Sequence, residues 1–404
     1  MHQVLAGVRV LDFGRYIAGP FCAALLGDLG AEVIRVEKVR GSEDRFIAPV
    51  APSGEGGMFL QMNRNKRSLT LNPTKPAGRE IVKRLVATAD VVVANLPPKT
   101  LEAMGLDLDS LRQVREDIIL TTVSAYGRGG RYSDRVGFDG IGQVMSGIAY
   151  MTGDADKPRR AAAPFVDYGT ALSCAYGTLA ALMARQQTGK GQMVEGALLR
   201  TALMMGNANL IEQAVIERNR LPTGNMSQTS GPGDIFRTAD GWVLCSVIGE
   251  PLFRRWVDLM AADNGTGGDG EEIDWLNDPR FADDLSRGDH GDVIGERMAA
   301  WCASRSTGEA VETLNAAMIP SGPVYSMQQT LDDPHIAEVG SFVELDYPDM
   351  PRPAPVAQPS VRLTETPATI RHRAPTLGEH TDEILGDLGY SSDEIAAFRA
   401  ERVV

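Results

Sequence analysis

Short β-branched runs alternate with amphipathic stretches over the first 130 residues, and this alternation constrains the fold more than any other feature. Strands are expected at 8–13, 32–37, 67–71, 91–95 and 118–123, with helices at 19–29 and 77–87. Alternation at this spacing predicts βαβ units on a mainly parallel sheet with both faces covered. Ligands of such sheets bind beyond the carboxyl ends of the strands. The sequence therefore predicts an α/β fold with its functional site at that edge.

The rest of the chain predicts a different organisation. A long Ala/Leu-rich helix is expected at 168–187, and a second helix at 198–217. The stretch 221–233 is rich in Gly, Pro, Ser and Thr, which is typical of a linker or loop. Residues 235–325 then predict a second unit with a strand at 242–247. The many prolines of 343–370 exclude a mostly helical segment there, and helix returns at 381–398.

The net charge of −13 is unevenly distributed. Residues 1–200 carry 25 Lys and Arg against 20 Asp and Glu, whereas residues 201–404 carry 15 against 33. An acidic chain does not favour non-specific nucleic-acid binding, so no nucleic-acid partner is expected. The basic first half suits a polyanionic small ligand. An unevenly charged but merely solvated surface explains the same numbers equally well.

The sequence also bears on compartment and metals. There is no apolar run of about 18 residues, and the N-terminus lacks the pattern of a secretory signal, so we expect no membrane association and a cytoplasmic protein. The four cysteines, Cys22, Cys174, Cys245 and Cys302, are widely separated and form no C-x-x-C pair. This spacing argues against a zinc site and against a disulfide framework. We therefore expect buried, reduced cysteines and no metal.

Several familiar catalytic motifs are missing. No G-x-G-x-x-G follows the first expected strand, and Gly189-Lys190 is followed by glycine rather than Ser or Thr, so it predicts a helix cap instead of a phosphate loop. There is no G-x-S-x-G nucleophile elbow. Histidine is absent from positions 3–289, so a Ser-His-Asp or Cys-His scheme would need a histidine from the second half to reach the sheet. Carboxylate chemistry remains as the main candidate.

Asp167 is the candidate catalytic carboxylate. It lies between a hydrophobic run and the start of the long expected helix. One interpretation is a plain N-cap, in which an Asp oxygen accepts a backbone N–H for about 1 kcal/mol. The alternative is a carboxylate nucleophile, because Asp serves that role when the intermediate is an activated acyl species, and a helix N-terminus favours its ionised form.

Sequence blocks along nearly the whole chain resemble one known family, the class III CoA-transferases, which also contains the α-methylacyl-CoA racemases. The blocks that carry the resemblance are 5–13, 18–20, 29–37, 65–68, 90–95, 104–105, 137–139, 188–192, 321–324 and 377–381.

The resemblance implies a fold and an assembly. It implies a Rossmann-like large domain built from both chain ends, with a smaller α+β domain inserted. The expected boundaries are 1–220 for the first part of the large domain, 221–330 for the small domain and 331–404 for the return to the large domain. It also implies an interlocked homodimer.

The resemblance also implies site residues and substrates. Asp167 falls on the nucleophile of the family. Positions that contact CoA in the family fall on Ala18, Lys38, Leu71, Asn95, Leu96, Arg135, Gly137, Phe138 and Asp139. A loop with Gly231 and Gly233 would act as a lid over the active site. No tightly bound cofactor is implied; coenzyme A enters as an acyl-CoA substrate, with a free carboxylic acid as its partner.

The chain departs from the formyl-CoA transferase pattern at Ile17, Ala103 and Val136, so we do not expect formate or oxalate as its acid. Racemases of the family carry histidine in the place of Phe138, and phenylalanine cannot move a proton. This difference favours transfer over racemisation. Two alternatives stay open from the sequence: an α-methylacyl-CoA racemase, and a non-catalytic CoA-binding protein in which Asp167 is only a cap.

Overall fold

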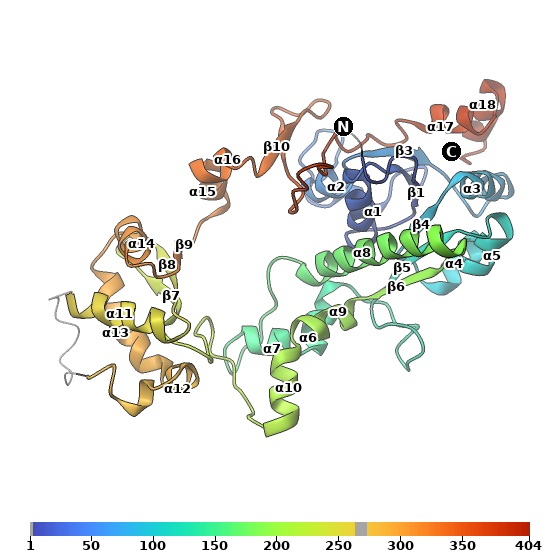
Figure 1. Ribbon diagram of the computed structural model, residues 1–404. Coiled ribbons are helices and arrows are strands. Elements are labelled where there is room, and N and C mark those ends of the chain that lie inside the picture. Colours follow the sequence, from blue (N-terminus) through green and yellow to red (C-terminus); the bar gives the residue numbers. More distant parts are fainter. Residues whose placement is uncertain (1–2, 263–272) are drawn as a thin grey trace. The chain divides into compact units, whose positions relative to one another are not determined.

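The computed structural model describes residues 3–262 and 273–404, which divide into two compact units (Figure 1). The first unit comprises the chain up to Ile148, Ala161–Glu217 and His335–Val404, and the second comprises Ala149–Arg160 and Arg218–Pro334. The excursion of Ala149–Arg160 into the second unit has no counterpart in the boundaries expected from the sequence.

The first unit is built on a parallel sheet of six strands. Their bounds are β1 Arg9–Asp12, β2 Glu32–Glu37, β3 Lys66–Thr70, β4 Val91–Ala94, β5 Ile119–Ser124 and β6 Met193–Ala197. They lie in the order β3-β2-β1-β4-β5-β6, and every neighbouring pair is parallel. The α/β prediction and its first five strands are confirmed. The sixth was missed because its sequence, MVEGA, holds one β-branched residue and a glycine.

The side chains of successive strand residues point into two separate cores, one on each face of the sheet. These strands are therefore hydrophobic on both faces. On one face Val10, Val33 and Val91 pack with α1 (Ala18–Asp28) and α8 (Phe165–Thr188). On the other face Leu11 and Ile34 pack with α3, α5 and the C-terminal helices. Those helices span Pro76–Thr88 (α3), Leu108–Val114 (α5), Thr381–Asp387 (α17) and Ser392–Ala400 (α18). Residues from both ends of the chain therefore complete this core.

Two helix boundaries differ from the sequence prediction. Helix α8 begins at Phe165, three residues before the expected start, so Asp167 lies inside its first turn. The helix expected at 198–217 is two helices, α9 (Leu198–Met205) and α10 (Asn207–Ile216), separated by Gly206. A glycine inside a helical pattern weakens the helix, and here it marks the break.

The remaining segments of the first unit are short. They are the 3-10 turn η1 (Glu43–Phe46), α2 (Gly57–Met62), α4 (Pro98–Met104), α6 (Asp139–Met145), and the strands β10 (Phe342–Leu345) and β11 (Ala354–Ala357). Strands β10 and β11 form an antiparallel pair within the proline-rich stretch, which agrees with the expected absence of helix there. Two further helices, α7 (Ile148–Thr152) and α16 (Pro334–Glu338), lie where the chain passes between the units.

The second unit combines a small antiparallel sheet with helices. Strands β7 (Gly233–Arg237), β8 (Trp242–Ser246) and β9 (Ser321–Pro323) form the sheet. The helical elements are α11 (Glu250–Ala262), η2 (Pro279–Phe281), α12 (Asp284–Asp289), α13 (Gly291–Ala303), α14 (Thr307–Ala316) and α15 (Met327–Asp332). Trp256 and Trp301 are buried in its core with Cys245 and Cys302.

Candidate active site

A cavity lies where the strand order reverses, between the carboxyl ends of β1 and β4. Ligands of open α/β sheets bind at this reversal, because the connections leave the two strands in opposite directions and open a crevice. The cavity measures about 260 Å³, and its walls come from the turn after β1, the segment after β4, the end of β5 and the start of α8. Asp167 is the residue that α8 contributes.

The carboxylate of Asp167 is buried but has no polar partner. Its residue is 8% exposed, and within the described part of the chain its side-chain oxygens make no hydrogen bond or ion pair. The N-cap position of α8 is Pro164, so Asp167 does not cap the helix. The plain N-cap interpretation is therefore wrong: this carboxylate faces a cavity instead of stabilising its own backbone.

Asp139, the first residue of α6, takes the capping role instead. Its Oδ1 atom accepts hydrogen bonds from the backbone N–H groups of Val166 at 2.8 Å and of Asp167 at 3.2 Å. Its Oδ2 atom accepts a hydrogen bond from the amide of Gln143. Asp139 is only 4% exposed and does not line the cavity. Free N–H groups in the first turn of a helix need such acceptors.

The environment of Asp167 disfavours its charged form. Burial and, secondarily, the negative charge of Asp139 raise the pKa of the Asp167 carboxyl to about 7. Near neutral pH the group is thus a mixture of carboxylic acid and carboxylate. A carboxylate with so high a pKa is also a stronger base and nucleophile than an ordinary surface aspartate.

A second cavity of about 670 Å³ adjoins the first. It lies beyond the carboxyl ends of β1, β2 and β3, and Arg15 and Leu96 line both cavities. Lys38 and Leu71 line the second one, and Lys38 is paired with Glu43 at its edge. Together the two cavities form an extended site, with Asp167 in one part and basic and apolar side chains in the other.

Arg15 stands between the cavities and is held by its neighbours. Its backbone N–H donates to Oδ1 of Asn95 at 2.7 Å, and Nδ2 of Asn95 donates to its carbonyl at 2.8 Å. Its guanidinium donates to the carbonyls of Phe13 and Gly14. Asn95, expected to contact CoA, therefore also braces the turn after β1.

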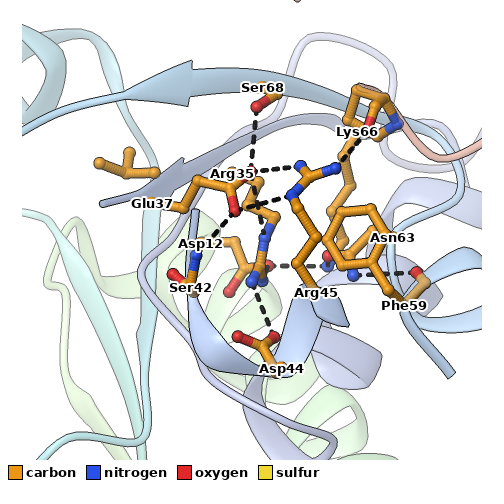
Figure 2. A network of polar contacts seen from close by, with 12 residues as sticks. Asp12, Arg35, Glu37, Ser42, Asp44, Arg45, Phe59, Asn63, Lys66 and Ser68 are labelled. Carbon is orange, nitrogen blue, oxygen red and sulfur yellow. Dashed lines mark hydrogen bonds and ion pairs between the residues drawn. The ribbon is translucent and has the colours of Figure 1, made fainter. Parts of the chain in front are cut away.

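A buried polar network that includes Asp12, Lys66, Arg35 and Arg45 lies next to this turn (Figure 2). Oδ1 of Asp12 accepts the backbone N–H of Gly14 at 2.8 Å, and its Oδ2 accepts from Nζ of Lys66 at 2.7 Å. Lys66 also donates to the carbonyl of Pro20 in the first turn of α1 and to Asn63. Each donor of this buried ammonium thus has an acceptor, as burial of a charge requires.

The network extends to Glu37, which lines the second cavity. Arg35 donates to Asp44 at 2.8 Å and lies 3.7 Å from Asp12. Arg45 pairs with Glu37, and its guanidinium stacks 3.9 Å from the ring centre of Phe59 (Figure 2). Arg45 also pairs with Glu55 at 3.1 Å. These contacts fix the segment after β2, which forms one wall of the second cavity.

Comparison with known proteins identifies the family of this chain. The model of CoA-transferase family III matches residues 5–381. The chain belongs to CoA-transferase family III. It is 33% identical to succinyl-CoA–D-citramalate CoA-transferase of Chloroflexus aurantiacus over 99% of this chain and 98% of that protein. It is 32% identical to a formyl-CoA:oxalate CoA-transferase of Rhodopseudomonas palustris, over 98% and 96% of the two chains. The protein is thus an enzyme that transfers CoA.

The fold comparison agrees with this assignment. The crystal structure of a CAIB/BAIF family protein from Brucella suis matches with a TM-score of 0.82 at 26% identity, covering 96% of this chain and 100% of that one. The resemblance inferred from the sequence is confirmed.

The transferase brings most of the expected site residues together. Ala18, Asn95, Leu96, Arg135, Gly137, Phe138 and Asp167 line the first cavity, and Lys38, Leu71 and Leu96 line the second. Asp139 lies behind the first cavity wall. Gly231 and Gly233 belong to the second unit, and their role as a lid stays a prediction. The contacts of all these residues with CoA likewise stay predictions.

Arg15 and Tyr16 are cavity residues that were not predicted from the sequence. Both follow β1 directly and line the first cavity, where the ring of Tyr16 packs edge-on against Phe138 at 5.1 Å. Tyr16 has a positive φ of 61°, which non-glycine residues rarely adopt. The rule that ligands bind beyond strand ends pointed to this turn, and applying it residue by residue would have found both side chains.

Three further features concern metal binding, membrane spans and the cysteines. Between 3–262 and 273–404 no group of three or more His, Cys, Asp or Glu side chains is arranged to hold a metal ion. Over the same ranges, every helix falls short of the length or apolar character needed to cross a bilayer. The four cysteines are buried and unpaired, as expected.

Proposed function

We propose that this enzyme moves CoA from an acyl-CoA donor to a free carboxylic acid, with Asp167 as the covalent nucleophile. The observation that carries the proposal is the buried carboxylate of Asp167, which faces a cavity and has no protein partner in the described chain. Burying such a group without a partner costs stability, so it is retained for chemistry.

The first half of the reaction would release the donor acid. An oxygen of Asp167 attacks the thioester carbonyl, and the C–S bond breaks to give a mixed aspartyl anhydride and the CoA thiolate. The thiolate then attacks the aspartyl carbonyl of the anhydride. This step forms an aspartyl-CoA thioester and releases the donor acid as a carboxylate, which closes the balance of atoms and charge.

The second half would load the acceptor. The acceptor carboxylate attacks the aspartyl thioester and releases the CoA thiolate, which leaves an anhydride between the acceptor and Asp167. The thiolate then attacks the acceptor carbonyl, so the new acyl-CoA leaves and Asp167 is regenerated. One thioester is exchanged for another, so the overall free-energy change is small and no ATP is required.

Exclusion of water is the main demand of this route, because anhydrides hydrolyse readily. The burial of Asp167 meets part of that demand in the first unit. We propose that the loop with Gly231 and Gly233 supplies the rest by covering the site while the intermediates exist.

The names of two relatives and the lining of the cavity support a proposal for the substrate class. Two relatives are named for succinyl-CoA as donor, with D-citramalate or L-malate as the acid. Arg135 and Arg15 line the cavity that holds Asp167, and a guanidinium pairs well with a second carboxylate on an acyl group. We therefore propose succinyl-CoA as the donor and a carboxylic acid other than formate or oxalate as the acceptor.

We further propose that the working unit is a homodimer. Helix α10 buries none of its residues, although it carries Val215 at 74% and Ile216 at 61% exposure. Tyr176 on α8 and Met204 on α9 are 76% and 65% exposed. Apolar side chains gathered on adjoining helices usually mark an interface. An interlocked second copy would cover them, and light scattering on the purified protein tests the expected mass of two chains.

One experiment tests the nucleophile directly. Wild-type enzyme incubated with succinyl-CoA and then hydroxylamine should yield a hydroxamate on the peptide that contains Asp167, identified by mass spectrometry. Asp167→Asn should abolish both the hydroxamate and CoA transfer while circular dichroism stays unchanged. Transfer at the wild-type rate by a folded Asp167→Asn protein would refute the assignment. A racemase would instead exchange the α-proton of a 2-methylacyl-CoA in heavy water without any acceptor acid.

A further inference from the structure

Asp139 and Asp167 are 28 positions apart in the sequence but meet at the first turn of α8. The Oδ1 atom of Asp139 accepts from the backbone N–H groups of Val166 and of Asp167 itself. The side chain that anchors the proposed nucleophile is therefore another carboxylate. A neutral residue such as Ser or Asn is an equally good helix cap, so capping alone does not call for a second negative charge at this place.

We propose that Asp139 is a positioning residue of the transfer reaction, whose Oδ1 atom anchors the backbone of Asp167 and whose negative charge acts on the Asp167 carboxylate. The inference rests on the proposed role of Asp167 as nucleophile, and it gives Asp139 a function other than contact with CoA.

Gln143 completes the anchor from one turn further along α6. Its Nε2 donates to Oδ2 of Asp139, and its Oε1 accepts the backbone N–H of Ala161 at 2.8 Å. The chain leaves the first unit at Ala149 and re-enters it at Ala161. Asp139 and Gln143 thus hold the re-entering segment at two points, Ala161 and Val166.

Close packing makes this placement rigid. A Cβ atom at Gly142 would lie 2.8 Å from Cγ1 of Val166 and 3.1 Å from the carbonyl oxygen of Leu198. Helices α6, α8 and α9 therefore meet at a distance that only glycine permits at this position. Thr170 and Thr201 add a hydrogen bond between α8 and α9 at 2.8 Å.

The negative charge of Asp139 acts on the Asp167 carboxyl, and the other groups around it are neutral, paired or without a resolved effect. Helix α9 presents the neutral hydroxyl of Thr201 here, and the one acid of α1, Asp28, is paired with Arg64. The other charged cavity residues are Arg15, Asp134 and Arg135, and Tyr168 is the neighbouring phenol. Of all these groups, Asp139 is the one whose charge contributes to the raised pKa of about 7 at Asp167.

The sharpest test moves the negative charge from position 139 to position 143 and keeps every hydrogen bond of the anchor. In D139N/Q143E, the asparagine oxygen still accepts from Val166 and Asp167, its amide donates to the new carboxylate at position 143, and that carboxylate accepts from Ala161. We expect a folded enzyme whose acid limb of kcat/KM moves about 0.5–1 pH unit lower, and whose rate on the plateau falls because the nucleophile is less basic. Glu116→Gln, an exposed charge loss, should leave the limb in place.

A second variant tests the anchor. Asp139→Ala removes the acceptor as well as the charge, and we expect kcat to fall about 10- to 100-fold with a much smaller change in KM for acyl-CoA. A folded D139N/Q143E enzyme with an unmoved acid limb would overturn the inference, as would an Asp139→Ala enzyme with kcat within twofold of wild type. Activity of Asp167→Asn would instead refute the nucleophile itself, so the two failures are distinguishable.

Discussion

Lys66, the first residue of β3, donates a 2.7 Å hydrogen bond to Oδ2 of Asp12, the last residue of β1, and both side chains are fully buried. The pair lies beneath the turn that carries Arg15 and leads into α1. Asp12 also accepts a hydrogen bond from the backbone N–H of Gly14, and Lys66 also donates one to the carbonyl of Pro20 in the first turn of α1. This ion pair therefore connects the sheet to the wall of the active-site cavity.

Loss of this pair should destabilise the first unit. Lys66→Met leaves the carboxylate of Asp12 buried without its nearest cation, which costs about 3–5 kcal/mol in comparable buried pairs. We expect a lower melting temperature by calorimetry, with Lys99→Met, an exposed lysine, as the matched control. Equal melting temperatures for the two variants would show that the pair contributes nothing to stability.

Two glycines of α6 should respond very differently to alanine. At Gly142 a Cβ atom would collide with Val166, next to the proposed nucleophile, whereas at Gly140 nothing lies within 4 Å. Gly142→Ala should therefore cost about 1–3 kcal/mol and lower kcat, since α8 must shift. Gly140→Ala should keep wild-type stability and rate. Both variants are compared by thermal unfolding and steady-state kinetics; similar behaviour would contradict the close packing.

The rate of transfer should depend on the ionisation of Asp167. The attacking group is the carboxylate, and its pKa is raised to about 7. The ionised fraction therefore rises with pH, and kcat/KM should increase through pH 7 and level off above pH 8. Measurement of initial rates between pH 5.5 and 8.5 in buffers of constant ionic strength checks this; a profile that is flat across the range is incompatible with such a nucleophile.

The same group should cost the enzyme stability at neutral pH. A pKa raised in the folded state means that the folded protein holds a proton between pH 4 and pH 7 that the unfolded chain has released, so stability from this group falls as pH rises through that window. Asp167→Asn removes the cost. At pH 8 we expect its free energy of unfolding to exceed that of wild type by up to roughly 4 kcal/mol, and its melting temperature to be higher. This gain in stability should shrink as the pH is lowered toward 4.5. A gain that is largest at low pH would reverse the assigned direction.

The sequence predicted the framework because that information is local. Continuous β-branched runs such as Val91–Ala94 and the spacing of helices between them determined a parallel sheet covered on both faces. The parallel sheet in turn put the site at the strand ends. The strand Met193–Ala197 was not predicted because its composition is not typical of a strand. It is a strand because it pairs with β5.

The sequence by itself thus determined the α/β sheet, the family and the choice of Asp167, since these depend on residue types and on their order along the chain. Only the tertiary structure decided that Asp139 caps α8, that Asn95 braces Arg15 and that Asp167 has no partner among the described residues. A hydrogen bond between residues far apart in the sequence leaves no periodic trace. The burial that raises the pKa of Asp167 likewise exists only once α6, α8 and α9 are packed together.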